Sequence, residues 1–208
     1  FDRPGNPYHD AGGRSYEDNA ERFMLLCRVG ELLAEDAFGL RWRPDVVHCN
    51  DWQTALLPLL LHARRPRPAL VFTIHNLAYQ GLFPYEELAR LGIAPHYFHP
   101  DALEFHGSLS FIKGGIVFAD RVTTVSPSYA REIQTPAFGH GLDGLLRHRS
   151  PVLSGILNGI DTTAWNPARD PSLALNYGVA TLARKRQNKI ALQAEAGLDT
   201  DPAAPLLA

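Results

Sequence analysis

The fold is decided by the stretch Leu70-Val71-Phe72-Thr73-Ile74-His75-Asn76. Its first five residues are apolar or β-branched, which is the pattern of a short strand buried within a sheet. Two polar residues, His75 and Asn76, follow this strand directly. A buried strand that ends in polar side chains is typical of a parallel sheet with a ligand site at its carboxyl edge.

Further along the chain in both directions, predicted strands alternate with predicted helices. The other strand signals cover residues 45–49, 121–125 and 152–157. Helices are predicted for residues 18–36, where Asp18 is the expected cap, and for 52–62, 85–91, 103–118, 127–133 and 181–196, where Thr181 is the expected cap. This alternation predicts an α/β fold with an open, mostly parallel sheet and helices on both faces.

Polar residues follow every predicted strand. Because ligands of open α/β sheets bind outside the carboxyl ends of the strands, we expect these residues to converge on one edge. Asn, Asp, His and Trp together suit a ligand rich in hydroxyl groups. The four clusters are His48 with Asn50 and Asp51, His75 with Asn76, Ser126, and Asn158-Gly159-Ile160-Asp161.

The composition is that of an ordinary globular protein. Hydrophobic residues make up 45% and charged residues 20%, and the formal net charge of -2 gives no reason to expect nucleic acid or an anionic membrane as a partner. The longest apolar run, residues 55–61, is far shorter than a membrane-spanning helix requires. Two cysteines, Cys27 and Cys49, form no disulfide framework, which favours a reduced, cytoplasmic setting.

Five long motifs strongly resemble bacterial glycogen synthase and plant starch synthase. They occur in the family's order and extend over nearly the whole chain. The motifs are Tyr8-His9-Asp10, Asn50-Asp51-Trp52, His75-Asn76-Leu77-Ala78-Tyr79-Gln80-Gly81, Thr124-Val125-Ser126-Pro127-Ser128-Tyr129-Ala130-Arg131-Glu132-Ile133 and Ile156-Leu157-Asn158-Gly159-Ile160-Asp161.

The resemblance implies a two-domain glycosyltransferase with two Rossmann-like domains and an active site between them. Such an enzyme transfers glucose from ADP-glucose to the non-reducing end of an α-1,4-glucan and retains the anomeric configuration. ADP-glucose and the glucan (a glycogen or starch primer) are then the partners, and no cofactor or metal is expected. Residues 1–180 would be the first Rossmann-like domain, and 181–208 the helix and connector to the second.

The resemblance also assigns roles to individual residues. His75 and Asp51 are the predicted catalytic residues, with His75 near the reacting carbon and Asp51 on sugar hydroxyls or active-site loops. Tyr8, Asn76 and Asn158 are predicted to bind the donor substrate. Both ends of the sequence have the pattern of a fragment. We therefore expect an N-terminal lysine-glycine loop and a second domain in other parts of a longer protein, and we expect this chain to be inactive without them.

Simpler interpretations compete with these roles. Asp51 is also a good helix N-cap, Asn158-Gly159 is a common turn, and Tyr8 could simply pack against the N-terminal loop. Two other functions also fit the sequence. One is a different two-domain retaining glycosyltransferase, of the sucrose or trehalose-phosphate synthase type, and the other is a non-catalytic α-glucan-binding module.

Three other patterns carry less weight. Residues 139–144 satisfy GxGxxG, but no strand precedes them, so a mobile loop is the better interpretation. His96, His99 and His106 lack the companions of a metal site. The basic residues 184–186 with Lys189 are typical of a solvated helix face.

Overall fold

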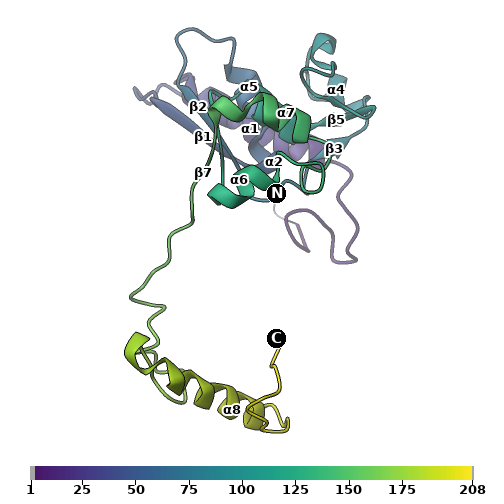
Figure 1. Cartoon of the computed structure of the whole chain (residues 1–208). Coiled ribbons are helices and arrows are strands. Elements are labelled where there is room, and N and C mark those ends of the chain that lie inside the picture. The colour runs from purple at the N-terminus through teal and green to yellow at the C-terminus, as the bar shows by residue number, and fades with distance from the viewer. Residues whose placement is uncertain (1–2, 208) are drawn as a thin grey trace. The chain divides into compact units, whose positions relative to one another are not determined.

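The computed structural model describes residues 3–207 (Figure 1). The chain forms two compact units, Phe1–Asn158 and Gly159–Ala208. This division falls earlier than the one predicted between residues 180 and 181. That prediction concerns the domains of a longer protein and stays a prediction.

The first unit is built on a four-stranded sheet in the order β1-β2-β6-β7. Every neighbouring pair is parallel, and each connection crosses over through helices, as parallel pairing requires. The predicted α/β class with a parallel sheet flanked by helices is confirmed. The strands are β1 (Val46–Asn50), β2 (Ala69–Ile74), β6 (Arg121–Thr124) and β7 (Leu153–Gly155).

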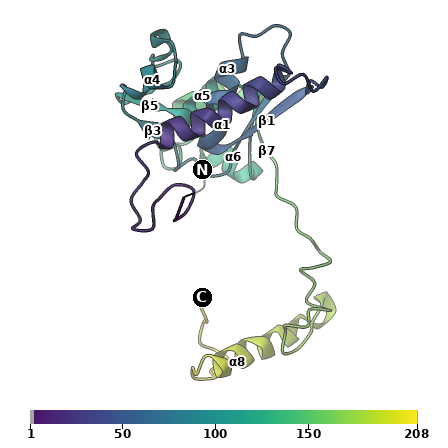
Figure 2. The same ribbon diagram turned by 180° about the vertical axis from the view of Figure 1, so that it is seen from behind.

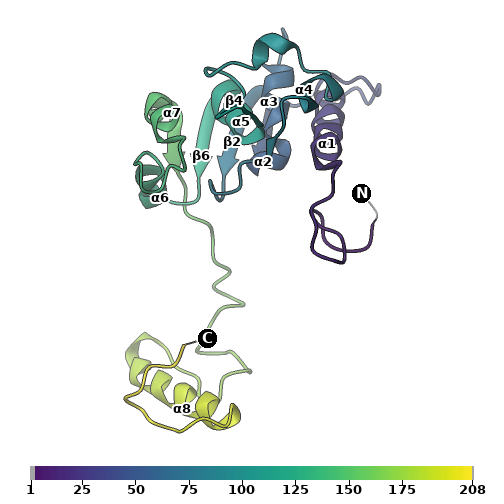
Figure 3. The same cartoon turned by 90° about the vertical axis from the view of Figure 1, so that its right-hand side faces the viewer.

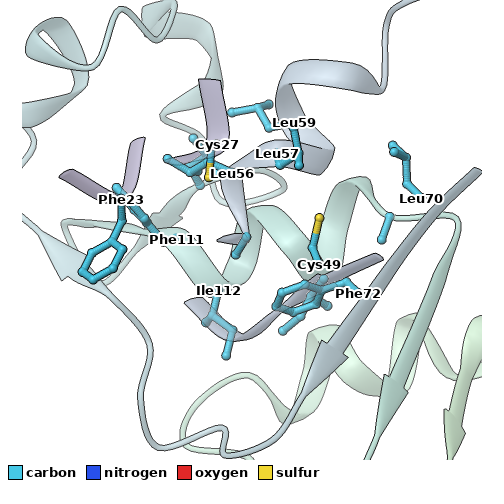
Figure 4. Packing of buried hydrophobic residues seen from close by; sticks show 14 of the residues in the cluster. Phe23, Cys27, Cys49, Leu56, Leu57, Leu59, Leu70, Phe72, Phe111 and Ile112 are labelled. Atoms are coloured by element: carbon cyan, nitrogen blue, oxygen red, sulfur yellow. The ribbon is translucent and has the colours of Figure 1, made fainter. Parts of the chain in front are cut away.

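The helices of this unit pack on the sheet and on one another. α3 packs against both α1 and α5, and α5 also packs on β2, whereas α6 packs on β6 and β7 (Figures 2 and 3). Figure 4 shows part of this core, to which Cys27, Leu56, Phe72 and Ile112 belong. The helices are α1 (Asn19–Ala34), α2 (Asp51–Thr54), α3 (Leu56–Leu61), α4 (Glu87–Arg90), α5 (Phe111–Phe118), α6 (Pro127–Glu132) and α7 (Asp143–His148), with short 3₁₀ turns at Pro95–Tyr97 and Ser150–Val152.

The helix predicted for residues 52–62 is broken at Ala55 into α2 and α3. Pro58 lies in the first turn of α3, where its missing N–H costs nothing. In one continuous helix, however, its ring would clash with the carbonyl four residues earlier, that of Thr54, where α2 ends. The break therefore has a cause in the sequence.

The helix predicted for residues 103–118 is wrong in its first half. Glu104–Phe105 (β4) and Ser108–Ser110 (β5) form an antiparallel hairpin instead, and β5 also pairs with Leu82–Phe83 (β3). The turn consists of His106 and Gly107, whose φ angles are 49° and 81°. Two consecutive positive φ angles are the geometry of a tight hairpin turn that matches the strand twist.

The predicted cap of α1 is also corrected. Asp18 precedes the helix as expected, but its side chain accepts no hydrogen bond from the helix. Its carboxylate instead pairs with Arg3, with N–O distances of 2.8 and 2.5 Å. Arg3 thus ties the N-terminal loop to the start of α1.

Both cysteines are free and buried, Cys27 on α1 and Cys49 on β1. Burial raises the pKa of each thiol to about 12. Because the thiolate is the reactive form, both behave as small apolar side chains of the core.

Asp120 joins the beginnings of the two central strands. Its carboxylate accepts hydrogen bonds from Arg67 Nη1 and Nη2 and from the Leu70 N–H, each at 2.7 Å. The hydrogen bonds from the Arg67 guanidinium are the main reason that the pKa of Asp120 lies below its ordinary value.

Asp120→Asn is expected to lower the free energy of unfolding by about 1 kcal/mol at neutral pH. The loss is modest because the Asp120 side chain is 40% exposed and solvent screens the pair. Since the folded-state pKa is depressed, this stabilisation exists above the ordinary carboxyl pKa of about 3.9 and vanishes as the pH falls through the folded value. Urea unfolding of both proteins over a pH series measures it, and a difference that did not shrink in acid would contradict it.

The second unit is organised around α8 (Lys185–Glu195), preceded by a 3₁₀ segment, Val179–Arg184. The predicted cap is wrong, because Thr181 lies inside that segment with φ −125° and accepts a hydrogen bond from the Gly178 N–H. Lys189, predicted to lie on a solvated face, instead donates to the carbonyl oxygens of Asp201, Pro202 and Ala204.

Across residues 3–207, no helix is both long and apolar enough to cross a membrane.

Candidate functional site

His75 is held by the end of the neighbouring strand at the carboxyl edge of the sheet. Its backbone N–H donates to Asp51 Oδ1 at 2.7 Å, and its ring Nε2 lies 3.0 Å from Asn50 Oδ1. The parallel register of β1 and β2 brings the strand ends together, as the pattern of polar strand ends predicts. His75 is exposed, so its ring is anchored on one side and open to solvent on the other.

Asp51 adopts a left-handed backbone conformation, with φ 55°. Asp is among the few non-glycine residues that tolerate this region, and such conformations concentrate at functional sites. Its carboxylate accepts the hydrogen bond from the His75 N–H, and the N-cap position of α2 is held by Asn50 rather than by Asp51. Of its two predicted interpretations, the structure therefore favours support of the loop after β2 over helix capping.

Asn76 begins the loop that follows β2. Its Oδ1 accepts from the Ala78 N–H at 3.0 Å, a local turn that occupies the amide oxygen. The next N–H, that of Leu77, donates to the hydroxyl of Tyr129 on α6 at 3.0 Å. Asn76 is exposed and its amide nitrogen remains the group available to a ligand.

Tyr129 is a support residue that sequence reasoning did not single out, although it lies inside a family motif. Its own N–H donates to Ser126 Oγ, the N-cap of α6, at 2.9 Å. The strand end after β6 is therefore coupled to the loop after β2. No sequence signal could reveal this coupling, because Tyr129 and Leu77 are 52 positions apart.

The GxGxxG segment is anchored to the same loop. Gln80, which is buried, donates from Nε2 to the carbonyl oxygen of His140 at 3.0 Å. The predicted mobile loop is thus tied to the family motif, and α7 begins within it at Asp143.

Tyr8 lies next to α2, the short helix that begins at Asp51. Its hydroxyl accepts from Gln53 Nε2 at 2.8 Å, and its ring packs on Phe23 and Trp52. Tyr8 as a whole is 36% exposed, so it both packs the N-terminal loop and keeps one side open. The structure thus brings Tyr8, Asp51, His75 and Asn76 to one region of the sheet edge.

Gly81, the last residue of the family motif that begins at His75, lies against the ring of Trp52. A Cβ at this position would lie 2.4 Å from Trp52 Cε3, and the backbone has φ 60°. Phe23, Phe83 and Phe111 surround the indole, so it cannot move aside. Only glycine fits here.

Gly81→Ala is expected to lower the free energy of unfolding by about 3 kcal/mol, combining a left-handed penalty with overpacking. Gly107→Ala is the matched control, because it has φ 81° with nothing within 4 Å of the added Cβ. The control should lose about 1 kcal/mol. Denaturant unfolding measures both, and equal losses would show that the contact with Trp52 does not matter.

Asn158 does not follow a strand that neighbours the one preceding His75. It comes after β7, which is separated from β2 by β6, so the ends of β2 and β7 lie roughly 10 Å apart along the sheet edge. Asn158 is exposed, and none of the hydrogen bonds among residues 3–207 involves its side chain. Its predicted role in binding the donor is untested by this geometry.

At the candidate site, His75 and Asn76 are both exposed to solvent. A cavity of about 550 Å³ lies at the other end of the strands, lined by residues that include Asp45, Arg65 and Pro68, and contains none of the predicted site residues. Among the described residues, no group of three or more His, Cys, Asp or Glu side chains is placed to hold a metal ion.

Comparison with known proteins places these motifs in a family. The model of the starch synthase catalytic domain matches residues 1–148, which include the four residues gathered at the sheet edge. The chain belongs to this family. The assignment favours a starch or glycogen synthase over the sucrose or trehalose-phosphate synthase type.

Curated relatives of the starch synthase catalytic domain family agree. The chain is 61% identical over 207 residues to glycogen synthase 1 of Methylococcus capsulatus, covering 100% of this chain and 42% of that protein. It is 57% identical over 208 residues to the glycogen synthase of Marinobacter nauticus, again covering 100% of this chain and 42% of the relative. The chain therefore spans less than half the length of these relatives.

A solved structure shows the same fold. The catalytic domain of starch synthase IV from Arabidopsis thaliana, bound to ADP and acarbose, superposes with a TM-score of 0.71 at 36% identity. The match covers 92% of this chain and 40% of that one. The predicted resemblance to glycogen and starch synthases and the Rossmann-like α/β class are thereby confirmed.

Proposed function

We propose that this chain forms the first domain of a two-domain glycosyltransferase that transfers glucose from ADP-glucose to the non-reducing end of an α-1,4-glucan, with retention. The observation that carries the proposal is the anchoring of His75 by Asn50 and Asp51 at an open sheet edge, inside the family's motif. The relatives are glycogen synthases, and the solved neighbour is bound to ADP and acarbose. Donor and glucan are thus the proposed ligands of this edge.

The arrangement suits a sugar held by hydrogen bonds. His75 and Asn76 present an imidazole and an amide to solvent, while Asp51, Tyr129 and Gln80 hold the loop that carries them. A preorganised set of donors and acceptors lowers the barrier by fixing the sugar before the bond to the diphosphate breaks.

Retention through two flanking carboxylates does not fit this edge. A retaining glycosidase requires two carboxyl groups about 5 Å apart across the scissile bond. Here Asp51 Oδ1 is already bound to the His75 N–H. The proposal instead requires that the departing diphosphate be stabilised by groups outside this open edge, and it requires no cofactor beyond the nucleotide sugar. The cytoplasm remains the predicted location.

The test is incorporation of radiolabelled glucose from ADP-glucose into glycogen by the full-length protein that contains this chain. UDP-glucose in the same assay compares the two donors, and digestion of the product by an α-1,4-specific amylase establishes the linkage. Tight binding of maltooligosaccharides by the 208-residue chain, with no transfer by the longer protein, would favour the glucan-binding module instead.

A further inference from the structure

Asn50 forms a hydrogen bond with the ring of His75, and the chemistry of the amide oxygen determines which of the two atoms is the donor. Asn50 Oδ1 lies 3.0 Å from His75 Nε2. An amide oxygen only accepts hydrogen bonds, so the proton must be on Nε2. A neutral imidazole has one N–H, and Nδ1 then carries the lone pair. The contact with Asn50 thus selects one of the two tautomers of His75.

The backbone of Asn50 is held firmly enough to make this selection. The Asn50 N–H donates to Thr54 Oγ1 at 2.7 Å, and the same hydroxyl donates to the Asn50 carbonyl oxygen at 2.8 Å. Asn50 itself has an extended backbone, with φ −128° and ψ 125°. The Thr54 hydroxyl therefore holds both the backbone N–H and the carbonyl oxygen of Asn50, the residue that positions the imidazole.

Asn50 and Asp51 support different parts of His75. In a regular strand, consecutive side chains point to opposite faces. The left-handed conformation of Asp51 ends that alternation, and both side chains bond to His75. Asp51 holds the main chain of His75, and Asn50 holds its ring.

We propose that Asn50 is a positioning residue that keeps His75 in the Nε2–H tautomer, so that Nδ1 accepts a hydrogen bond from a hydroxyl group of the bound sugar. The sugar in this inference rests on the proposed function. Within residues 3–207, no group donates to His75 Nδ1, which leaves that atom for a ligand. A ligand that offers hydroxyl groups satisfies it, whereas one that offers only phosphate or carbonyl oxygens does not.

The tautomer can be observed directly in the 208-residue chain. Long-range ¹H–¹⁵N correlation NMR at alkaline pH, where imidazoles are neutral, distinguishes the two tautomers by their ring nitrogen shifts. We expect His75 as the Nε2–H form, assigned by the loss of its signals in His75→Gln. His62 is an internal reference of the opposite kind, because its Nδ1 lies 2.6 Å from the Leu59 carbonyl oxygen and must donate. An Nδ1–H form of His75 would overturn the proposal.

Two substitutions of Asn50 distinguish the effect of its acceptor oxygen on the His75 tautomer from a general disturbance of the structure. Asn50→Ala removes the acceptor and should convert His75 to a mixture of tautomers. Asn50→Asp retains an acceptor oxygen and should restore the Nε2–H form. The His62 shifts should stay unchanged in both variants, which reports that the fold is intact. If His75 keeps its tautomer in Asn50→Ala, Asn50 does not set it.

The activity of the full-length protein provides the second readout. Asn50→Ala is expected to lower kcat about tenfold to a hundredfold in the glucose-transfer assay, and Asn50→Asp to recover most of that loss. If the wild-type protein transfers glucose and Asn50→Ala matches it, this inference fails while the proposed function stands. If the tautomer responds as expected but the wild-type protein transfers no glucose, the proposed function fails instead.

Discussion

His75→Ala is expected to reduce glucose transfer from ADP-glucose by roughly a hundredfold to a thousandfold. The substitution removes the exposed imidazole that follows β2, together with its contact to Asn50. Because the ring is exposed, little packing is lost and the protein should remain folded. The measurement is the rate of radiolabel incorporation into glycogen, with the free energy of unfolding determined in parallel.

The matched control for His75 is His148→Ala. His148 is also exposed, but it lies at the end of α7 and outside the candidate site. It should transfer glucose at the wild-type rate. A wild-type rate in His75→Ala would remove His75 from the site, and an equal fall in both variants would point to a loss of stability rather than of a catalytic group.

Asp51→Ala is expected to lower both activity and stability. Alanine tolerates φ 55° poorly, and the His75 N–H loses its charged acceptor. We expect a loss of about 2 to 3 kcal/mol in the free energy of unfolding and about a hundredfold in transfer rate. Urea unfolding and the transfer assay measure the two effects.

Asp51→Asn separates two roles of this residue. Asparagine accepts the left-handed conformation and retains an Oδ1 acceptor, so most of the stability should return. If the transfer rate returns as well, Asp51 acts by holding the main chain of His75. A rate that stays low in a stable Asp51→Asn protein would show that the charge itself is needed. Wild-type behaviour of Asp51→Ala in both assays would contradict any role.

The secondary structure shows where sequence patterns are sufficient. The four parallel strands were predicted because each is a short apolar run bounded by polar residues, and this pattern depends only on burial. The hairpin of β4 and β5 was missed because its turn, His106-Gly107, lacks the Asn or Asp that marks such turns. The break between α2 and α3 could have been predicted from Pro58 alone, through its clash with the carbonyl of Thr54.

The candidate site likewise has some features that the sequence predicts and others that it does not. That His75 and Asp51 lie at one sheet edge follows from the sequence, because carboxyl ends of parallel strands share an edge. Which atoms meet does not follow. The bond from the His75 N–H to Asp51 depends on a left-handed backbone, and Tyr129 reaches Leu77 only because α6 packs beside β6 and β7. Asn158 belongs to the same family motifs, yet two strands separate β7 from β1.

By itself, the sequence determined the α/β class, the family and the edge of the sheet where the candidate site residues gather. These depend on patterns that are local in the chain: strand runs, polar strand ends and long motifs. Only the tertiary structure decided that Asn50 fixes the ring of His75 while Asp51 fixes its main chain, and that Asp51 is not a helix cap. These are contacts between residues about 25 positions apart, and their geometry is set by strand register and by one strained φ angle, which no local pattern encodes.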